Sequence, residues 1–98
     1  MANLDFTWDP AKARANIRKH GVSFIEAQSV FFDDQARLLD DPDHSAAEDR
    51  FILLGLSAAI RVLVVVHAFR EAQGTIRIIS ARKATPTERK RYERGRRS

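Results

Sequence analysis

The spacing of apolar residues changes along this chain from a helical period to the alternation that is typical of strands. Phe24, Ala27 and Phe31 recur at intervals of three and four residues, which places them on one face of a helix. From residue 36 onward, short runs rich in branched residues alternate with turn-forming segments. The pattern therefore predicts helices first and a sheet afterwards, which is an α+β arrangement.

Both predicted amino-terminal helices carry signals that mark where they begin. The first has Asp9 as its N-cap, a proline at its first position and Gly21 after its last turn. The second opens with a capping box formed by Ser23 and Glu26, and we expect it to cover residues 24–31. Because this second helix has a single apolar face, both helices are expected to pack on one face of the sheet.

The remainder of the chain predicts four strands and one more helix. The strands are expected at residues 36–39, 50–56, 61–69 and 75–81. The link Glu71–Gly74 is short enough to join the last two strands as a hairpin, in which Arg70 pairs with Thr75. The predicted fold is therefore α+β, with two amino-terminal helices on a four-stranded antiparallel sheet and a carboxy-terminal helix. No long linker divides residues 1–98, so we expect a single domain in which residues 95–98 fray.

The last predicted helix is unusual because it carries charge and almost nothing apolar. It opens with the capping pattern Thr85-Pro86-Thr87-Glu88. The segment from Arg77 to Ser98 holds nine basic and two acidic residues, a net charge of +7, whereas the other 76 residues have a net charge of −3. The chain thus combines a strongly basic end with a mildly acidic body, and a polyanion is the first partner to consider.

Composition excludes several functional classes. The chain has no cysteine, which rules out disulfides, iron–sulfur clusters and thiol nucleophiles and is compatible with the cytoplasm, where we expect the protein to act. Its first residues lack the pattern of an export signal. The longest apolar run, residues 60–69, is about half of the ~20 residues that span a bilayer, so no membrane partner is expected. The acidic loop at residues 40–45 lacks the spacing of a calcium loop, and we expect neither a metal nor a cofactor.

Basic side chains on the predicted hairpin form a pool of candidate site residues. This pool consists of Arg61, His67, Arg70, Arg77, Arg82 and Lys83. Alternation would place His67 opposite Ile78, and Arg77 on the other face together with Lys83. A one-residue slip would exchange the partners, so the sequence leaves the register open. Only a face that the helices leave uncovered can hold a site.

The residue types in this pool suit the cleavage of RNA without a metal. That reaction needs a base for the 2′-hydroxyl, an acid for the leaving oxygen and fixed cations for the charge of the phosphorane. His67, with an ordinary pKa of about 6.5, can serve in either proton role, and Tyr92 is a second proton donor or a stacking ring. Structural alternatives remain open: His67 bound to a backbone carbonyl, and arginines paired with acids such as Glu48, Asp49 or Glu71.

Several stretches together resemble the BrnT family of bacterial type II toxins. They are Phe6-Thr7-Trp8-Asp9-Pro10 with Lys12 and Asn16, Lys19 to Phe24 with Glu26-Ala27 and Val30-Phe31, Glu48-Asp49-Arg50, Gly55, Val64 to His67, and Ile76 to Ala84 followed by Glu88-Arg89 and Tyr92. The resemblance spans nearly the whole chain. It implies a RelE-like ribonuclease fold, RNA cleavage that arrests translation and growth, and a cognate BrnA-type antitoxin whose complex with the toxin binds operator DNA.

The resemblance also implies roles for individual residues. It points to Arg61, Arg77 and Arg82 as catalytic, together with His67 and Tyr92. The cations expected to track RNA phosphates are Arg70, Lys83, Arg89, Lys90 and Arg91. The leading hypothesis is therefore a metal-independent endoribonuclease toxin that leaves a 2′,3′-cyclic phosphate. The alternatives are a non-catalytic nucleic-acid-binding or repressor module and, with less support, a ligand-binding sheet domain.

Overall fold

The computed structural model describes residues 4–41 and 50–95, and within them five strands form one sheet in the order β1-β5-β4-β3-β2. The strands are β1 Asp5–Thr7, β2 Arg37–Asp40, β3 Arg50–Leu56, β4 Val62–Arg70 and β5 Thr75–Lys83. The helices are α1 Pro10–His20, α2 Phe24–Ser29 and α3 Pro86–Gly95, with short 3-10 turns η1 Val30–Phe32 and η2 Glu71–Gln73. None of these helices is long and apolar enough to cross a membrane. Residues 96–98, most of those expected to fray, and residues 42–49 of the acidic loop and beyond lie outside the described part.

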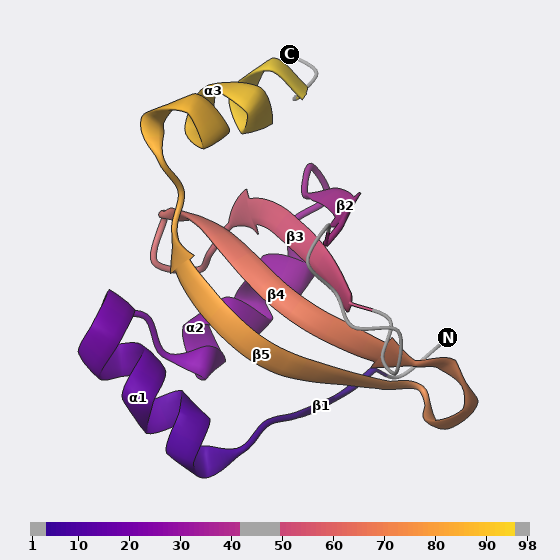
Figure 1. Cartoon of the computed structure of the whole chain (residues 1–98). Helices are drawn as coiled ribbons and strands as arrows, with labels where there is room; N and C mark the ends of the chain where they lie inside the picture. Colours follow the sequence, from indigo (N-terminus) through magenta and orange to yellow (C-terminus); the bar gives the residue numbers. More distant parts are fainter. Residues whose placement is uncertain (1–3, 42–49, 96–98) are drawn as a thin grey trace.

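The sheet differs from the expected one by a fifth strand. Strand β1 runs parallel to β5, with Phe6 beside Ile76 and Thr7 beside Arg77, so the sheet is mixed and the prediction of four antiparallel strands is wrong on this point. Figure 1 shows β1 alongside β5 at one edge of the sheet. Strand β1 was not predicted, because three residues are too few to establish an alternating pattern.

The capping signals of the two amino-terminal helices are confirmed. The Asp9 carboxylate accepts a hydrogen bond from the Ala11 amide at 2.9 Å, and Gly21 ends α1 in the left-handed conformation, with a φ of 69°. The Ser23 hydroxyl accepts from the Glu26 amide at 3.0 Å at the start of α2. The α-helical part of the second helix ends at Ser29, and the remainder of the predicted segment forms the turn η1.

The β4–β5 hairpin contains an irregularity that decides which side chains share a face. Arg70 pairs with Thr75 and His67 with Ile78, as predicted. A β-bulge between Val66 and His67 then shifts the register, so that Arg82 pairs with Val64 and Lys83 with Leu63. The prediction that Arg77 and Lys83 share a face is therefore wrong. Because alternate residues of β4 share a face, Arg77 opposite Ala68 and Arg82 opposite Val64 lie together.

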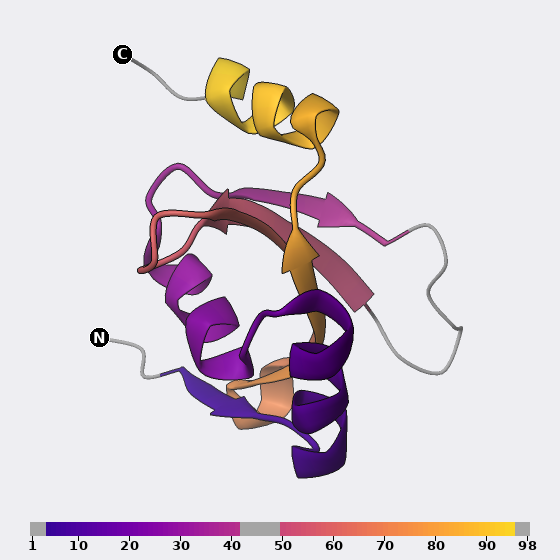
Figure 2. The same ribbon diagram turned by 90° about the vertical axis from the view of Figure 1, so that its left-hand side faces the viewer.

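Helices α1 and α2 cover one face of the sheet, and α3 lies over the opposite face. We call the face under α1 and α2 the covered face and the opposite one the α3 face; Figure 2 shows the two helices on one side and α3 on the other. The main core on the covered face is formed by Val22, Phe24, Ala27, Val30, Leu53, Leu63, Val65, Ile78 and Ala81. A smaller cluster on the α3 face contains Leu54, Val64 and Tyr92.

The buried Asn16 joins helix α1 to strand β5. Its side-chain amide donates to the carbonyls of Val22 at 2.9 Å and of Ala81 at 2.8 Å, and its carbonyl accepts from the Ala81 amide at 3.1 Å. Buried backbone groups need such partners, since an unmade hydrogen bond in the interior is costly. Asn16 thereby fixes the backbone of β5 one residue before Arg82.

Candidate functional site

Arg82 is held in place by the first turn of α3. Its guanidinium donates two hydrogen bonds to the carboxylate of Glu88, at 2.8 and 2.9 Å. The same carboxylate accepts from the Thr85 amide at 2.8 Å, while the Glu88 amide donates to the Thr85 hydroxyl at 3.2 Å, so the predicted capping box is formed. Hydrogen bonding from Arg82 lowers the pKa of Glu88 to about 2, and the pairing raises the pKa of Arg82. With 41% of its side chain exposed, Arg82 is a fixed cation that solvent reaches.

A cleft of about 410 Å³ lies between α3 and the sheet. It is lined by Leu39, Asp40, Ile52, Leu54, Val64, Arg82, Glu88 and Arg91. The strands supply a floor of aliphatic side chains, and α3 with the end of β5 supplies a charged rim. The cleft was not predicted from the sequence, because the aliphatic residues of its floor follow the same alternation as residues that pack under a helix.

Tyr92 fastens α3 to the sheet. Its side chain is 2% exposed and packs in the cluster with Leu54 and Val64. Its hydroxyl donates to the Asp33 carboxylate at 2.6 Å, and the same oxygen of Asp33 accepts from the Leu56 amide at 2.8 Å. Of the two roles considered for Tyr92, proton donor and stacking ring, stacking on a base does not fit a ring buried to this extent.

A second contact holds the carboxy-terminal part of α3. The guanidinium of Arg37 in β2 donates to the backbone carbonyl of Arg91 at 3.1 Å. A Cβ atom added at Gly95 would lie 2.9 Å from Arg37 Cδ, so the arginine stem runs closely against the helix. Together with Tyr92 and the Arg82–Glu88 pair, Arg37 gives this polar helix a defined position, which its composition did not predict.

The remaining cations of the hairpin and of α3 are distributed over both faces. Arg77 lies half-buried on the α3 face, between Thr7 of β1 and Ala68 of β4. Arg70 is exposed at the end of β4, and the pairing of Lys83 with Leu63 places it on the other side of the sheet from Arg82. Of the α3 cations, Arg89, Lys90 and Arg91 are all exposed.

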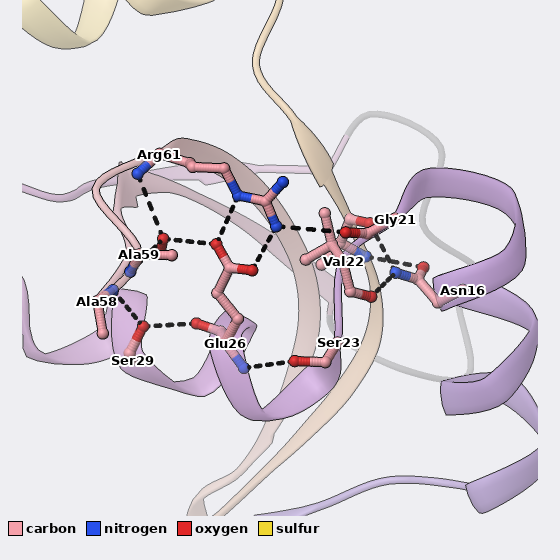
Figure 3. A network of polar contacts seen from close by, with 11 residues as sticks. Asn16, Gly21, Val22, Ser23, Glu26, Ser29, Ala58, Ala59 and Arg61 are labelled. Atoms are coloured by element: carbon pink, nitrogen blue, oxygen red, sulfur yellow. Dashed lines mark hydrogen bonds and ion pairs between the residues drawn. The ribbon is translucent and has the colours of Figure 1, made fainter.

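Arg61 is committed to a network on the covered side, shown in Figure 3. Its Nε donates to Glu26 at 2.9 Å, its Nη2 contacts the other oxygen of the same carboxylate, and Nη2 also reaches the Gly21 carbonyl at 3.3 Å. The Ser57 hydroxyl donates to Glu26 at 2.7 Å. Hydrogen bonding with Arg61 lowers the pKa of Glu26, and that with Glu26 raises the pKa of Arg61. Arg61 thus ties the β3–β4 turn to α2, and the structure does not bring it to Arg77 and Arg82.

His67 also lies on the covered face, contrary to the expectation that it joins an open site. Its side chain is 4% exposed. The centroid of its ring lies 4.8 Å from that of Phe31, with the two rings nearly perpendicular, and 6.1 Å from that of Phe51. Nδ1 lies 3.3 Å from the Val65 carbonyl, which is the structural alternative that the sequence left open. Burial lowers the pKa of His67 below its usual 6.5, so the ring is neutral at neutral pH.

The acidic partner of Arg82 is Glu88, which the sequence did not suggest, and that of Arg61 is Glu26. Glu48 and Asp49 lie outside the described residues, whereas Glu26 and Glu88 make the contacts seen in the structure. Both glutamates are the third residue of their helix, three residues after a capping serine or threonine. This pattern is the sequence signal that could have identified them as partners of the arginines. No cluster of three or more potential metal ligands occurs among residues 4–41 and 50–95.

Comparison with known proteins identifies the family. The family model described as "Ribonuclease toxin, BrnT, of type II toxin-antitoxin system" matches residues 8–88 of the chain. The chain belongs to the BrnT family. As a type II toxin of this family, it is associated with an RNA substrate and an antitoxin partner. No functionally curated protein matches the sequence.

A solved structure shows that the BrnT fold is shared. The crystal structure of the Brucella abortus ribonuclease toxin BrnT matches with a TM-score of 0.65 and 22% sequence identity. The match covers 85% of this chain and 99% of the Brucella chain. At this identity the likeness establishes the fold, an α+β arrangement of helices on a mixed sheet, and leaves the roles of individual residues to the geometry of this chain.

Proposed function

We propose that this BrnT-family chain is an endoribonuclease that cleaves RNA by internal attack of the 2′-hydroxyl, without a metal, and leaves a 2′,3′-cyclic phosphate. Cleavage of cellular RNA would inhibit translation and growth in the cytoplasm. The observation that carries this proposal is that Arg77 and Arg82 lie on the same face of the sheet, where Arg82 also lines the cleft that α3 borders.

Charge stabilisation is the catalytic contribution that this geometry supports best. The transition state carries extra negative charge on the phosphorane oxygens, and preorganised cations stabilise it most effectively when they need not reorganise. Arg82 is fixed by Glu88 and remains charged at any working pH, because the pairing raises its pKa. The backbone of Arg77 is held within β5 by neighbouring strands on both sides, which places its side chain on the same face as that of Arg82.

The other three residues that were predicted to be catalytic have a structural role in this proposal. Arg61 and His67 lie on the covered side, and the hydroxyl of Tyr92 is engaged by Asp33. We therefore treat these three as residues that hold the sheet and α3 in place, and we assign them no proton transfer. The exposed α3 cations Arg89, Lys90 and Arg91 would bind RNA phosphates. Arg70 at the hairpin end and Lys83 on the covered face would contact RNA that extends beyond the α3 face.

The basic helix also suits the inhibitory partner. An acidic segment of a BrnA-type antitoxin would dock on α3, whose exposed face carries Arg89, Lys90 and Arg94. Such docking would mask the cations that RNA uses, and operator DNA would be bound only by the toxin–antitoxin complex. Competition between RNA and an acidic antitoxin peptide for the purified toxin tests this arrangement.

Product analysis tests the ribonuclease proposal directly. Purified protein is incubated with RNA in the presence of a chelator, and the new 3′ ends are analysed for cyclic phosphate. Arg77→Ala and Arg82→Ala are expected to reduce cleavage, whereas Arg18→Ala, which removes an exposed cation from the last turn of α1, should not. Intact RNA with folded wild-type protein would refute the proposal.

A second candidate, non-catalytic nucleic-acid binding, gains support from the burial of His67 and Tyr92. It predicts binding that weakens steeply as salt rises, with no new RNA ends. The same incubation distinguishes the two functions, because only a nuclease changes the length of the RNA.

A further inference from the structure

The floor of the cleft under α3 is apolar and is built from three neighbouring strands. Leu39 of β2 pairs with Ile52 of β3, and Leu54 of β3 pairs with Val64 of β4, so all four side chains lie on the α3 face. The half-buried Leu39 and Ile52 supply the accessible part of the floor, and Leu54 and Val64 are buried at its base beside Tyr92. At about 410 Å³ the cleft falls within the range of ~300–1,000 Å³ that is typical of small-molecule sites. A surface of this kind suits a flat apolar group.

The charges around the cleft balance. Arg82 and Arg91 are matched by Asp40 and Glu88, and the Glu88 carboxylate is already engaged by Arg82. Burial of a phosphate over the aliphatic floor would be costly, since a charge in apolar surroundings must be paired. The cleft therefore favours a neutral group inside, with any attached phosphates outside it beside Arg82 and Arg91.

The cleft is also held open by fixed contacts. Tyr92 binds Asp33, Arg37 binds the Arg91 carbonyl, and Arg82 binds Glu88, so α3 is attached to the sheet at three points around it. A preformed site avoids the entropic cost of ordering on binding. The space between α3 and the strands is thus available to a ligand without rearrangement of the helix.

We propose that this cleft binds one unstacked nucleobase of the RNA, with Arg82 and Arg91 contacting the backbone phosphates on either side of it. Proteins recognise single-stranded RNA by splaying bases out, and flipped bases are commonly held between aromatic or apolar side chains. The inference deepens the proposed ribonuclease function, because it names the part of the substrate that occupies the cleft and sets the position of the scissile phosphate beside Arg82.

Methyl NMR tests the occupant without requiring cleavage. The probe is a short single-stranded RNA with 2′-O-methyl groups, which blocks the internal attack, and the control is an abasic oligonucleotide with the same number of phosphates. Ring currents of a bound base should shift the methyl signals of Leu39, Ile52, Leu54 and Val64, and the abasic control should not shift them. Signals of Leu38 and Leu53, which line the pocket around His67 on the covered face, should stay in place.

A pair of adjacent substitutions tests the same site by affinity. Leu39→Trp would fill the cleft, while Leu38→Trp places the same ring on the opposite face, at a side chain that is 61% exposed. We expect Leu39→Trp to weaken binding of the 2′-O-methyl RNA about tenfold or more, the order of the loss of one base contact. Leu38→Trp should bind as the wild type does, and thermal melting of both variants checks that they fold.

The outcomes separate this inference from the proposed activity. Wild-type protein that leaves unmodified RNA intact refutes the nuclease, and the methyl shifts still decide whether a base occupies the cleft. Equal shifts with the abasic oligonucleotide would show that phosphates alone are recognised and would overturn the inference. Shifts that an antitoxin peptide produces and RNA does not would assign the cleft to the antitoxin, with the same consequence.

Discussion

Two arginine–glutamate pairs lie on opposite sides of the sheet and are built in the same way. In each, the glutamate is the third residue of a helix that opens with a capping box: Glu26 of α2 binds Arg61, and Glu88 of α3 binds Arg82. The pair on the covered side joins segments 35 residues apart and is reinforced by Ser57 and the Gly21 carbonyl. The pair on the α3 face joins residues only six apart.

The difference between the pairs lies in what surrounds them. The Glu26–Arg61 pair fills a junction of three backbone segments; Glu26 keeps only 14% of its side chain exposed, and the guanidinium of Arg61, which is 33% exposed, is bound by the carboxylate and by the Gly21 carbonyl. The Glu88–Arg82 pair borders the 410 Å³ cleft, where both side chains remain accessible. The same local chemistry therefore stabilises the fold on one side and presents a fixed cation on the other. The predictions below test this assignment, beginning with the largest expected effect.

Removal of the cation on the α3 face should affect activity far more than stability. Under the proposed function, Arg82→Ala is expected to lower the cleavage rate roughly 10²–10³-fold, as the loss of one preorganised donor to an oxyanion does. Arg82→Lys keeps the charge but loses the bidentate contact, so its cleavage rate should lie between those of the wild type and Arg82→Ala. Single-turnover cleavage kinetics provide the measurement. A rate for Arg82→Ala within a factor of two of wild type would contradict the catalytic role.

Removal of the cation on the covered side should do the opposite. Arg61→Ala leaves Glu26 with Ser57 and should lower the free energy of unfolding by about 1–2 kcal/mol, a value reduced from that of a fully buried pair because solvent reaches Arg61. Urea denaturation measures the change. Activity per folded molecule should stay close to wild type, and a loss as large as that of Arg82→Ala would place Arg61 in the catalytic site.

Tyr92→Phe separates anchoring from proton donation. The variant removes the hydroxyl that donates to Asp33 and keeps the ring in its apolar cluster, so stability should fall by about 1 kcal/mol. If Tyr92 only fastens α3, the cleavage rate of the folded variant changes little. A loss of activity of a hundredfold or more with intact structure would instead show that its hydroxyl takes part in the reaction.

His67 should affect neither activity nor stability at neutral pH, and its effect should appear only as the pH falls. Because burial lowers the pKa of His67 in the folded state, the unfolded chain takes up this proton first as the pH falls. The stability from this group is fully present above about pH 6.5 and is lost below it, by at most ~1.4 kcal/mol per pH unit. His67→Leu should remove this part of the pH dependence in urea denaturation curves. An unchanged slope between pH 5 and 6.5 would show that His67 does not titrate as proposed.

Local signals allowed much of the secondary structure to be predicted. The capping residues Asp9, Ser23 and Thr85, and the short link before Thr75, correctly indicated the starts of three helices and the pairing at the hairpin. Such signals work because they depend on residues within one turn of each other. Strand β1 escaped prediction because its pairing partner lies some seventy residues away along the chain.

The candidate site was predicted in part. The basic residues of β5 and α3 were recognised, and Arg77 and Arg82 lie on one face. Alternation placed Arg82 with Arg61 and His67 and placed Lys83 with Arg77, and the β-bulge exchanges Arg82 and Lys83 between the faces. The aliphatic floor of the cleft was missed, since a strand residue that lines a cleft and one that lies under a helix have the same character.

The amino-acid sequence by itself determined where the helices start, the succession of the antiparallel strands along the chain, the concentration of positive charge at the carboxy-terminal end and the resemblance to the BrnT family. Each of these depends on residue types and on short-range spacing. Tertiary structure alone decided which arginine meets which glutamate, which side of the sheet His67 occupies and where α3 leaves a cleft. These features depend on long-range contacts and on one extra residue in a strand, and a shift of one residue moves side chains from one face to the other.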